Sequence, residues 1–468
     1  MQYVSTRGVA DELNFEGVTL TGLARDGGLY VPAAIPTLDA ETFRRLRGRP
    51  YADVAFAVLQ PFVGDSLTAA ELRGMVDATY GDAFHHPAVA PLVQVDRNDW
   101  ILELFHGPTL AFKDFALQLL GRLFDAFTAR RGGRLTILGA TSGDTGSAAI
   151  AGCRGRDAVT IFMLHPHGRV SEVQRRQMTT VLEPNVVNIA IDGTFDDCQA
   201  LVKAAFNDLD FRDGVSLTAV NSINWARVLA QVVYYVSAAV SLGAPDRPVS
   251  FSVPTGNFGD IFAGYIARAM GLPVARLVIA TNSNDILART LKTGRYDRAG
   301  VHKTLSPSMD IQVASNFERL LFDLKGRSGN AVSAAMEDLA TQGGFALSPD
   351  ERGALAALFA AERLDDGQTS RIMADTYGRS GYLADPHTAV GLGAARACLD
   401  EDGPPRVTLA TAHPAKFPDA VAAATGVTPA LPSHMGDLMQ AEERFETLPN
   451  DLAALKRRML DHLSGVET

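Results

Sequence analysis

Cysteine is scarce in this sequence of 468 residues, which contains only Cys153, Cys198 and Cys398. The three lie far apart and form no CxxC pair, so their spacing favours neither disulfide bonds nor a thiolate metal site. Such low usage is typical of proteins from a reducing compartment. The first eight residues also lack the basic-then-apolar pattern of a secretory signal. We therefore expect a cytoplasmic protein.

Basic tracts and long apolar runs are missing as well. The formal net charge is −10, which argues against nucleic acid and anionic membrane surfaces as partners. The longest apolar helical stretch, residues 228–240, is interrupted by Gln231 and is too short to span a bilayer. These features favour a globular protein that acts on a small molecule, without a nucleic acid or membrane partner.

Several common ligand motifs are absent too. The sequence has no GxxxxGK-Ser/Thr loop for a nucleoside triphosphate, and no histidine or glutamate spacing that indicates a metal centre. The run Gly391-x-Gly393-x-x-Arg396 ends in arginine where the dinucleotide fingerprint needs a small residue. Because this run lies inside an expected helix, we interpret it as a helix-packing motif.

Short apolar strands alternate with amphipathic helices from about residue 98 onward. The pattern predicts strands near 100–105, 135–139, 158–164, 186–191, 249–253, 274–280 and 407–410. It predicts helices near 114–131, 171–182, 196–208, 222–242 and 260–270. Such alternation is typical of an α/β fold with mainly parallel sheets and helices on both faces.

The first part of the chain has a different organisation, with helical stretches near 39–47, 51–62 and 69–79. We expect an N-terminal domain over 1–95, a central region of two α/β lobes over 96–430, and a polar helical tail over 431–468. Within the central region, the run Ser348-Pro349-Asp350-Glu351 has the form of a capping box with proline at the first helical position.

Lys113 lies in an apolar segment between an expected buried strand and the first turn of an expected helix. The positive end of the helix dipole and the neighbouring Phe112 and Phe115 both disfavour an ammonium there. A lysine with a destabilised charge is a better amine nucleophile, which is what an imine-forming lysine needs. The alternative for any single lysine is a packed stem with its charge in water.

Two strand-to-helix turns share the pattern of a hydroxyl residue followed by Gly-x-x-Gly. The first is Ser142-Gly143-Asp144-Thr145-Gly146, and the second is Thr255-Gly256-Asn257-Phe258-Gly259. In such turns glycines let the backbone approach a ligand, and N–H groups at the helix start face an anion. We expect two lobes that each present an anion cradle at the carboxyl ends of their strands. The second turn suits phosphate better, because Asp144 in the first would repel a dianion.

Two other polar segments are candidates for ligand binding. Thr411 ends an expected strand and Lys416 follows in the next loop. A hydroxyl there can face a cofactor ring, although a threonine that bonds its own turn is the alternative. Asn224 and Arg227 open a long helix, where they suit a carboxylate or a phosphate. An ordinary N-cap followed by a surface arginine is the alternative.

The Lys113 segment, both glycine turns and the run from Thr411 to Phe417 occur in one chain in this order. With the opening Tyr3-Val4-Ser5-Thr6-Arg7-Gly8 and the turn Asp26-Gly27-Gly28-Leu29-Tyr30, they closely resemble the threonine synthases, pyridoxal-phosphate enzymes of fold type II. The resemblance covers nearly the whole chain and points to the longer, N-terminally extended branch. It implies two parallel-sheet α/β lobes plus an N-terminal domain, with 96–430 as the pyridoxal-phosphate-binding region.

The resemblance also implies a role for each matching residue. Lys113 would bind pyridoxal 5′-phosphate as an imine and act in catalysis, and Thr411 would face the pyridine nitrogen. The cofactor's phosphate cradle would contain Gly256, Asn257, Phe258, Gly259 and Asp260. The family often has serine where this chain has Thr255, and both supply a hydroxyl. The candidate substrate residues are Ser142, Thr145, Asn224, Arg227 and Lys416, and no metal is expected.

The implied reaction converts O-phospho-L-homoserine and water into L-threonine and phosphate, the last step of threonine biosynthesis. The nearest alternative is another enzyme of fold type II, such as a threonine dehydratase or a β-replacement enzyme similar to cysteine synthase. The extended N-terminal unit weighs against it. An inactive relative that senses a phosphorylated small molecule is an alternative of another class, against which the retained Lys113 argues. The oligomeric state stays open.

Overall fold

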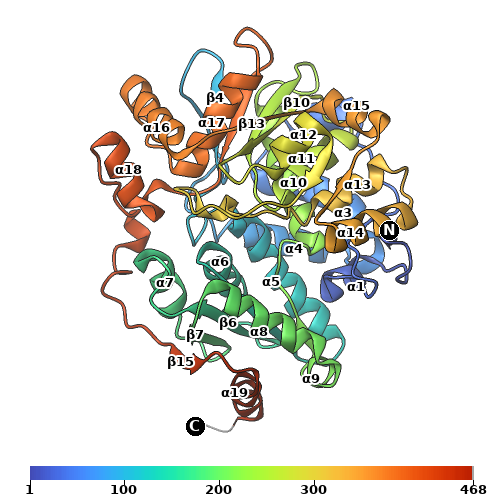
Figure 1. Cartoon of the computed structure of the whole chain (residues 1–468), viewed down its shortest axis with the longest axis vertical. Coiled ribbons are helices and arrows are strands. Elements are labelled where there is room, and N and C mark those ends of the chain that lie inside the picture. The colour runs from blue at the N-terminus through green and yellow to red at the C-terminus, as the bar shows by residue number, and fades with distance from the viewer. Residues whose placement is uncertain (466–468) are drawn as a thin grey trace. The chain divides into compact units, whose positions relative to one another are not determined.

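The computed structural model describes residues 1–465 of the chain (Figure 1). The chain divides into two compact units. Unit 1 comprises Met1–Val18, Leu23–Ala116 and Ser222–Ala430, and unit 2 comprises Thr19–Gly22, Leu117–Asn221 and the chain from Leu431 onward. The chain returns to unit 2 at the predicted boundary after residue 430, whereas this grouping has no boundary at residue 95. The three-part division therefore stays a prediction.

Unit 1 is built around a six-stranded sheet in the order β13-β10-β9-β14-β4-β3. Its strands are β3 (Leu92–Gln94), β4 (Asp99–Glu103), β9 (Val249–Pro254), β10 (Val274–Thr281), β13 (Phe359–Arg363) and β14 (Arg406–Ala410). Neighbouring strands pair in parallel from β13 to β4, and β3 is antiparallel to β4. The carboxyl ends of the parallel strands therefore share one edge, where α/β proteins bind ligands.

Helices cover both faces of this sheet, with α17 (Pro386–Cys398) on one side and α10 (Trp225–Ser241) and α11 (Gly259–Ala269) on the other (Figure 1). Adjacent residues of β9 contact helices on opposite sides, because successive side chains of a strand point to opposite faces of the sheet. The Ser252 hydroxyl donates to the carbonyl of Gly391 in α17 (2.7 Å), whereas Phe251 packs edge-on against Tyr235 in α10. A two-sided core of this kind explains the continuous apolar character of the strands.

Shorter elements complete unit 1. Strands β1 (Tyr3–Ser5) and β2 (Tyr30–Pro32) form an antiparallel pair, as do β11 (Arg295–Asp297) and β12 (Gly344–Ala346). The remaining helices are α1 (Phe15–Thr21), which crosses into unit 2, α2 (Ala40–Leu46), α3 (Tyr51–Val63), α4 (Ala69–Tyr80), α12 (Ile286–Thr293), α13 (Phe317–Leu324), α14 (Gly329–Thr341), α15 (Pro349–Leu358), α16 (Asp366–Ser380) and α18 (Pro418–Thr425). Tyr3 and Phe62 pack against Trp225, so the N-terminal residues are anchored to α10.

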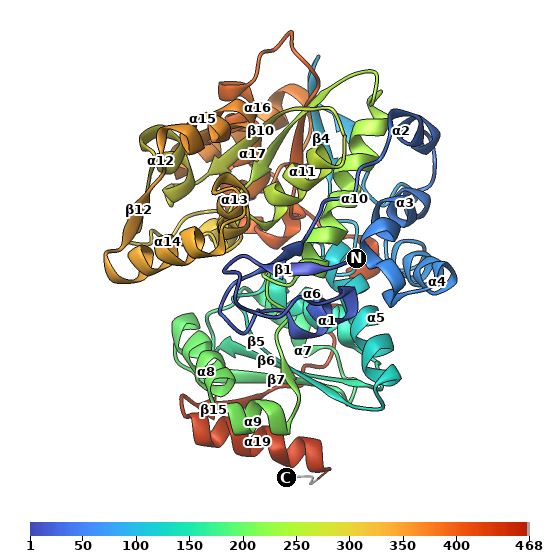
Figure 2. The ribbon, with the colours of Figure 1, turned by 90° about the vertical axis from the view of Figure 1, so that its right-hand side faces the viewer.

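Unit 2 contains a parallel five-stranded sheet in the order β15-β7-β6-β5-β8. Its strands are β5 (Leu135–Ala140), β6 (Val159–Pro166), β7 (Val186–Asp192), β8 (Leu217–Thr218) and β15 (Glu446–Pro449). Its helices are α6 (Asp144–Cys153), α7 (Glu172–Thr179), α8 (Phe195–Asn207), α9 (Leu209–Gly214), α19 (Leu452–Ser464) and α5 (Lys113–Arg130) beyond its first turn. Buried residues of α8 and α19 share an apolar cluster with the sheet (Figure 2).

Close packing of α5 against α6 depends on two glycines. A Cβ at Gly121 would lie 2.0 Å from the carbonyl oxygen of Gly152, and a Cβ at Gly152 would lie 2.2 Å from that of Leu117. Either side chain would push the two helices apart, because backbone atoms cannot move aside as a flexible side chain can.

The predicted α/β pattern is confirmed, with three instructive differences. The predicted helix 222–242 begins at Trp225, because the Asn224 side chain accepts from the N–H of Ala226 and caps it. The capping box at Ser348 opens α15 as predicted. Strand β13 follows α15 directly and was not predicted, because no turn residues separate the two elements in the sequence. The predicted helical tail contains α19 and also β15, whose polar edge-strand sequence lacks an apolar pattern.

No helix within residues 1–465 is long and apolar enough to cross a membrane. In the same part of the chain, histidine, cysteine and carboxylate side chains form no group of three or more that could hold a metal ion.

The interpretation of Gly391 as a helix-packing residue is confirmed, and the effect of this packing on stability can be measured. A Cβ there would lie 2.7 Å from Cγ2 of Thr408, so we expect Gly391→Ala to lower stability by about 1–3 kcal/mol through overpacking. Gly378→Ala in neighbouring α16 is a matched control, because its Cβ meets nothing within 4 Å. Helix propensity predicts an unchanged or higher stability, by up to about 1 kcal/mol. Urea unfolding checks both, and equal responses would contradict the packing account.

Candidate active site

Lys113 is the first residue of α5, as the sequence predicts, and it is half-buried. Its Nζ lies 5.0 Å from the centroid of the Phe112 ring. The N–H of Phe112 donates to the carbonyl of Thr411 (2.9 Å), and the N–H of His413 donates to the carbonyl of Leu110 (3.0 Å). These bonds pair the segment before Lys113 with the end of β14 and bring Thr411, which is buried, beside it.

A buried ion network holds the loop before Lys113. The Asp114 carboxylate accepts from the N–H (2.8 Å) and hydroxyl (2.7 Å) of Thr109, and Nζ of Lys416 donates to the Thr109 carbonyl (2.7 Å). Burial raises the pKa of Asp114 to about 6, while the bonds from Thr109 and the positive charge of Lys416 pull it down. A Cβ at Gly107 would lie 2.5 Å from Oδ2 of Asp114, so the loop closes tightly over this carboxylate.

The second glycine turn follows β9 and leads into the eleven-residue helix α11. The Asn257 carbonyl accepts from the N–H (3.0 Å) and side chain (3.1 Å) of Asn316, and Phe258 adopts a left-handed backbone with φ 65°. A Cβ at Gly256 would lie 2.8 Å from the carbonyl oxygen of Ser308. The turn is therefore braced by neighbouring backbone at a helix N-terminus, where free N–H groups can bind an anion.

Asp260, in the first turn of α11, is buried and faces α10. Its Oδ1 accepts from the hydroxyls of Tyr234 (2.6 Å) and Tyr235 (2.9 Å). Burial raises the pKa of Asp260 to about 6, against the two tyrosine hydrogen bonds and the positive charge of Lys113, which lower it. Asp260 thus belongs to the electrostatic surroundings of Lys113, and its predicted contact with the cofactor phosphate stays a prediction.

The first glycine turn lies in unit 2, between β5 and α6. Thr141 organises it, because its hydroxyl oxygen accepts from the N–H groups of Gly143 and Gly146, both at 2.9 Å. The Asp144 carboxylate accepts from the side chain of Gln174 in α7 (2.8 Å). Ser142 is exposed and Thr145 is half-buried. The sequence pattern of the turn did not include Thr141, although its position directly before the turn suits a hydroxyl that accepts from the N–H groups of the turn.

Asn224 and Arg227 lie at the start of α10 in unit 1, and both are buried. Asn224 is the N-cap of that helix, so the capping interpretation is confirmed while a ligand role stays a prediction. Arg227 is not the surface arginine of the alternative. Burial lowers its pKa to about 10, which still leaves it cationic at neutral pH.

Sequence models of three families match consecutive parts of the chain. "Threonine synthase N terminus" matches residues 2–80, "Pyridoxal-phosphate dependent enzyme" matches residues 84–374, and "Threonine synthase, C-terminal" matches residues 388–459. The threonine synthase of Pseudomonas aeruginosa is 57% identical over 463 residues, which is 99% of this chain and 98% of that protein. The chain belongs to the threonine synthase family.

Solved structures agree with this membership. Pyridoxal-phosphate-bound threonine synthase from Brucella melitensis superimposes with a TM-score of 0.97 at 56% identity, covering 99% of both chains. Threonine synthase from yeast gives a TM-score of 0.94 at 40% identity over the same shares. The fold is therefore that of the fold-type II pyridoxal-phosphate enzymes, as the sequence predicts.

The residues of unit 1 fit the cofactor of this family. A pyridoxal-phosphate site needs a lysine amine, an anion cradle and a partner for the ring. The paired segments before Lys113 and after β14 supply the amine and the Thr411 hydroxyl. The turn at Gly256 supplies the N–H groups of a helix start, and its backbone packs so closely on Ser308 that a single added Cβ would not fit.

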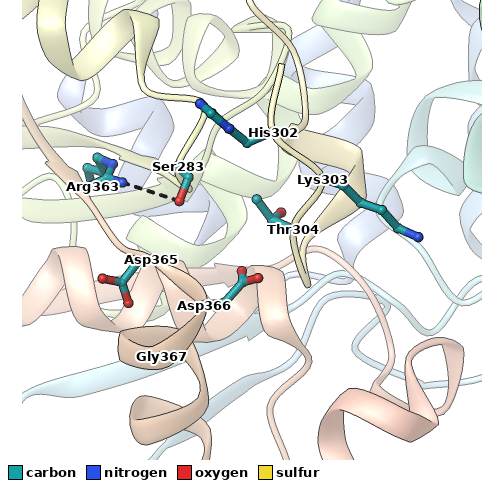
Figure 3. Close-up of a pocket in the computed structure, with 8 residues that line it drawn as sticks. All are labelled: Ser283, His302, Lys303, Thr304, Arg363, Asp365, Asp366 and Gly367. Atoms are coloured by element: carbon teal, nitrogen blue, oxygen red, sulfur yellow. Dashed lines mark hydrogen bonds between the residues drawn. The ribbon is translucent and has the colours of Figure 1, made fainter. Parts of the chain in front are cut away.

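A separate surface hollow of about 400 Å³ lies in unit 1 and contains none of the predicted site residues (Figure 3). Its walls are the end of β13, the start of α16 and the loops that contain Ser283 and His302. Arg363 donates to the Ser283 hydroxyl (3.4 Å), and Oδ1 of Asp366 accepts from the N–H of Leu305 (3.1 Å). Figure 3 shows the Lys303 amine pointing away from the other labelled side chains. Both charge signs line the hollow, so it selects no ligand class.

The buried Asp114 makes the stability of this loop dependent on pH. The carboxylate titrates near 3.8 when unfolded and at about 6 when folded, so the folded protein binds the extra proton between these values. Its stability contribution falls as the pH rises from about 4 to about 6. Asp114→Asn cannot titrate and loses one acceptor for Thr109. We expect its stability deficit to shrink by up to about 3 kcal/mol across this range. Urea unfolding at several pH values tests this, and a constant deficit would contradict it.

Proposed function

We propose that this chain converts O-phospho-L-homoserine and water into L-threonine and phosphate, with pyridoxal phosphate as cofactor. The observation that carries the proposal is the pairing of the Lys113 segment with the end of β14. The turn at Gly256 follows β9, which is the parallel neighbour of β14 in the same sheet. Full-length identity of 57% to a protein named threonine synthase supports the choice of reaction.

Lys113 would hold the cofactor covalently. When bound, the cofactor supplies an electron sink for the charge that develops when a proton leaves the substrate. The amine of Lys113, once released, would take the proton from the substrate's α-carbon and return protons at later steps. Its place at the start of a helix disfavours the ammonium and so favours the neutral amine that proton removal requires.

Residues around Lys113 would orient the cofactor. Backbone N–H groups of the turn from Gly256 to Gly259 would bind its phosphate, with the Asn257 side chain as a further donor. The hydroxyl of Thr411 would face the pyridine nitrogen. A neutral hydroxyl does not force that nitrogen to stay protonated, which moderates the electron sink and suits elimination and replacement chemistry.

The substrate would need two further anion sites, one for its carboxylate and one for the leaving phosphate. In unit 2, Ser142 and Thr145 at the start of α6 suit the carboxylate. In unit 1, Asn224 and the cationic Arg227 suit the phosphate. Lys416 was a candidate for the same phosphate, but its bond to Thr109 supports a bracing role for the Lys113 loop.

A cytoplasmic location is part of the proposal. Cys153, Cys198 and Cys398 are free thiols, and the first two are buried. Unpaired cysteines are typical of a reducing compartment.

An assay with O-phospho-L-homoserine tests the proposed reaction. We expect equal amounts of phosphate and L-threonine, because each turnover releases one phosphate from the γ-carbon and adds one water at the β-carbon. A chain that instead deaminated L-threonine, or exchanged the β-substituent of O-acetylserine for sulfide, would be one of the alternative fold-type II enzymes. Release of phosphate without threonine would also contradict the proposal.

Lys113→Ala tests the covalent role of this lysine. Removal of the amine should abolish turnover, and borohydride reduction should leave no cofactor on the peptide that contains residue 113. In the unsubstituted chain the same treatment should label Lys113, as peptide mass mapping would show. Lys292→Ala, on the exposed side of α12, is a control that should keep full activity and labelling. Label on residues other than Lys113 would refute the assignment.

Gly256→Ala tests the cradle. The added Cβ would lie 2.8 Å from a backbone oxygen of Ser308, so the turn must shift away from the geometry that binds phosphate. We expect cofactor affinity to fall about tenfold or more, equal to about 1.4 kcal/mol. Titration of the apoenzyme with pyridoxal phosphate measures it. Gly353→Ala in α15, with nothing within 4 Å of its Cβ, should bind the cofactor normally.

A further inference from the structure

Three buried side chains of α10 and α11 form a polar cluster that the proposed reaction does not use. Oδ1 of Asp260 accepts from both Tyr234 and Tyr235, and the Tyr235 hydroxyl also lies 3.0 Å from the Asp260 carbonyl. The other carboxylate oxygen, Oδ2, is buried and accepts no hydrogen bond from any side chain or backbone group of residues 1–465. A buried acceptor without a donor costs about 1–3 kcal/mol.

The cluster is built against the first turn of α5. The Phe115 ring packs edge-on against the Tyr234 ring, with centroids 5.5 Å apart and an interplanar angle of 81°. The Phe115 carbonyl accepts from the Tyr80 hydroxyl (2.9 Å). These contacts fix the helix start that bears Lys113 relative to Tyr234 and therefore to Asp260.

The charged and titratable groups around the cluster can be named element by element. Lys113 in α5 acts on Asp260 with its positive charge. Tyr234 and Tyr235 face Asp260 from α10, and burial raises the pKa of both phenols far above neutrality, so they act as neutral donors. Tyr51 in α3 and Arg227 in α10 interact electrostatically with Tyr234. Among the described residues, Lys113 is the cation whose charge acts on Asp260.

We propose that Asp260, oriented by Tyr234 and Tyr235, is a positioning residue that receives the amine of Lys113 through Oδ2 whenever this lysine is not bonded to the cofactor. The proposal rests on the covalent role proposed for Lys113. Two tyrosine donors hold one carboxylate oxygen and leave the other for a mobile donor. An ammonium there is stabilised by the carboxylate, and a neutral amine is not.

This arrangement couples two protons. While Lys113 is cationic, its charge keeps Asp260 ionised, and burial favours protonation of Asp260 once that charge is lost. Asp260 therefore determines how strongly the Lys113 amine holds a proton after it takes one from the substrate's α-carbon and before it returns one. The two tyrosines affect Lys113 indirectly, because each hydroxyl stabilises the ionised carboxylate of Asp260.

The test measures the protonation of Lys113 directly. In the apoenzyme, the rate of Lys113 acylation by an amine reagent, followed by mass spectrometry against pH, gives the midpoint for loss of the ammonium proton. Asp260→Asn keeps the side-chain shape and removes the charge, so the midpoint should fall by about one unit or more. Tyr234→Phe should lower it by less.

Asp323→Asn is the matched control. Asp323 is also a mostly buried carboxylate of unit 1 that accepts from a tyrosine, Tyr265 (3.1 Å), and burial raises its pKa. It pairs with Arg327 and not with Lys113. This variant should lose stability and leave the Lys113 midpoint unchanged. A general disturbance of the fold would instead move the midpoint in both variants, which would overturn the proposal.

Turnover provides the second readout. Asp260→Asn should lower kcat about tenfold or more, with the KM for substrate changed less than about threefold, because the proposed role of Asp260 acts through Lys113 and not through a contact with the substrate. Should Asp260→Asn fail to fold, Tyr234→Phe carries the test alone. Midpoints equal to that of the unsubstituted chain in the folded variants would overturn the proposal. Because acylation requires no turnover, failure of the threonine synthase assay would be recognised separately.

Discussion

The short antiparallel pairing of Leu110 and Ala111 with Ala412 and His413 is the contact on which the site depends. It joins the loop after β4 to the loop after β14. These two strands are parallel neighbours, and their carboxyl ends lie at one edge of the sheet. Through this pairing the start of α5, and with it Lys113, has a defined place relative to Thr411. A reactive lysine on an unpaired loop would lack the rigidity that catalysis requires.

Buried charges maintain that place at an energetic cost that their partners offset. Asp114 and Lys416 meet across the backbone of Thr109, and Asp260 meets Tyr234 and Tyr235. Removing a carboxylate from water raises its pKa, as at Asp114 and Asp260, and each hydrogen bond or nearby cation brings it part of the way back. Such networks stabilise only when their groups are paired, which makes the surroundings of Lys113 sensitive to single substitutions.

Unit 2 applies the same architectural rule with different residues. Its parallel strands also end at one edge, and the turn after β5 is organised by the Thr141 hydroxyl, which accepts from two backbone N–H groups. Gly121 and Gly152 then allow α5 and α6 to approach within backbone contact distance. Glycine thus has two functions in this fold, since it opens the cradles and lets helices pack closely.

Much of this molecule could be predicted from its sequence, because local patterns report local structure. The alternation of strands and helices, the glycine turns and the helix that begins at Lys113 all depend on residues close together in the chain. The same holds for the capping box at Ser348 and for the packing glycine at 391, which sits in a helical context. These signals, taken in order along the chain, were enough to indicate the family and its cofactor.

Only the tertiary structure decided which distant residues meet. Lys416 bonds Thr109 across 307 positions of the chain, and no local pattern encodes a contact of that separation. The direction of Asp260 depends on how α11 packs against α10, where Tyr234 and Tyr235 had been indistinguishable from core residues of an apolar helix. The sequence therefore determined the chemical groups and their secondary structure, whereas packing determined their neighbours, because burial and charge act through space and not along the chain.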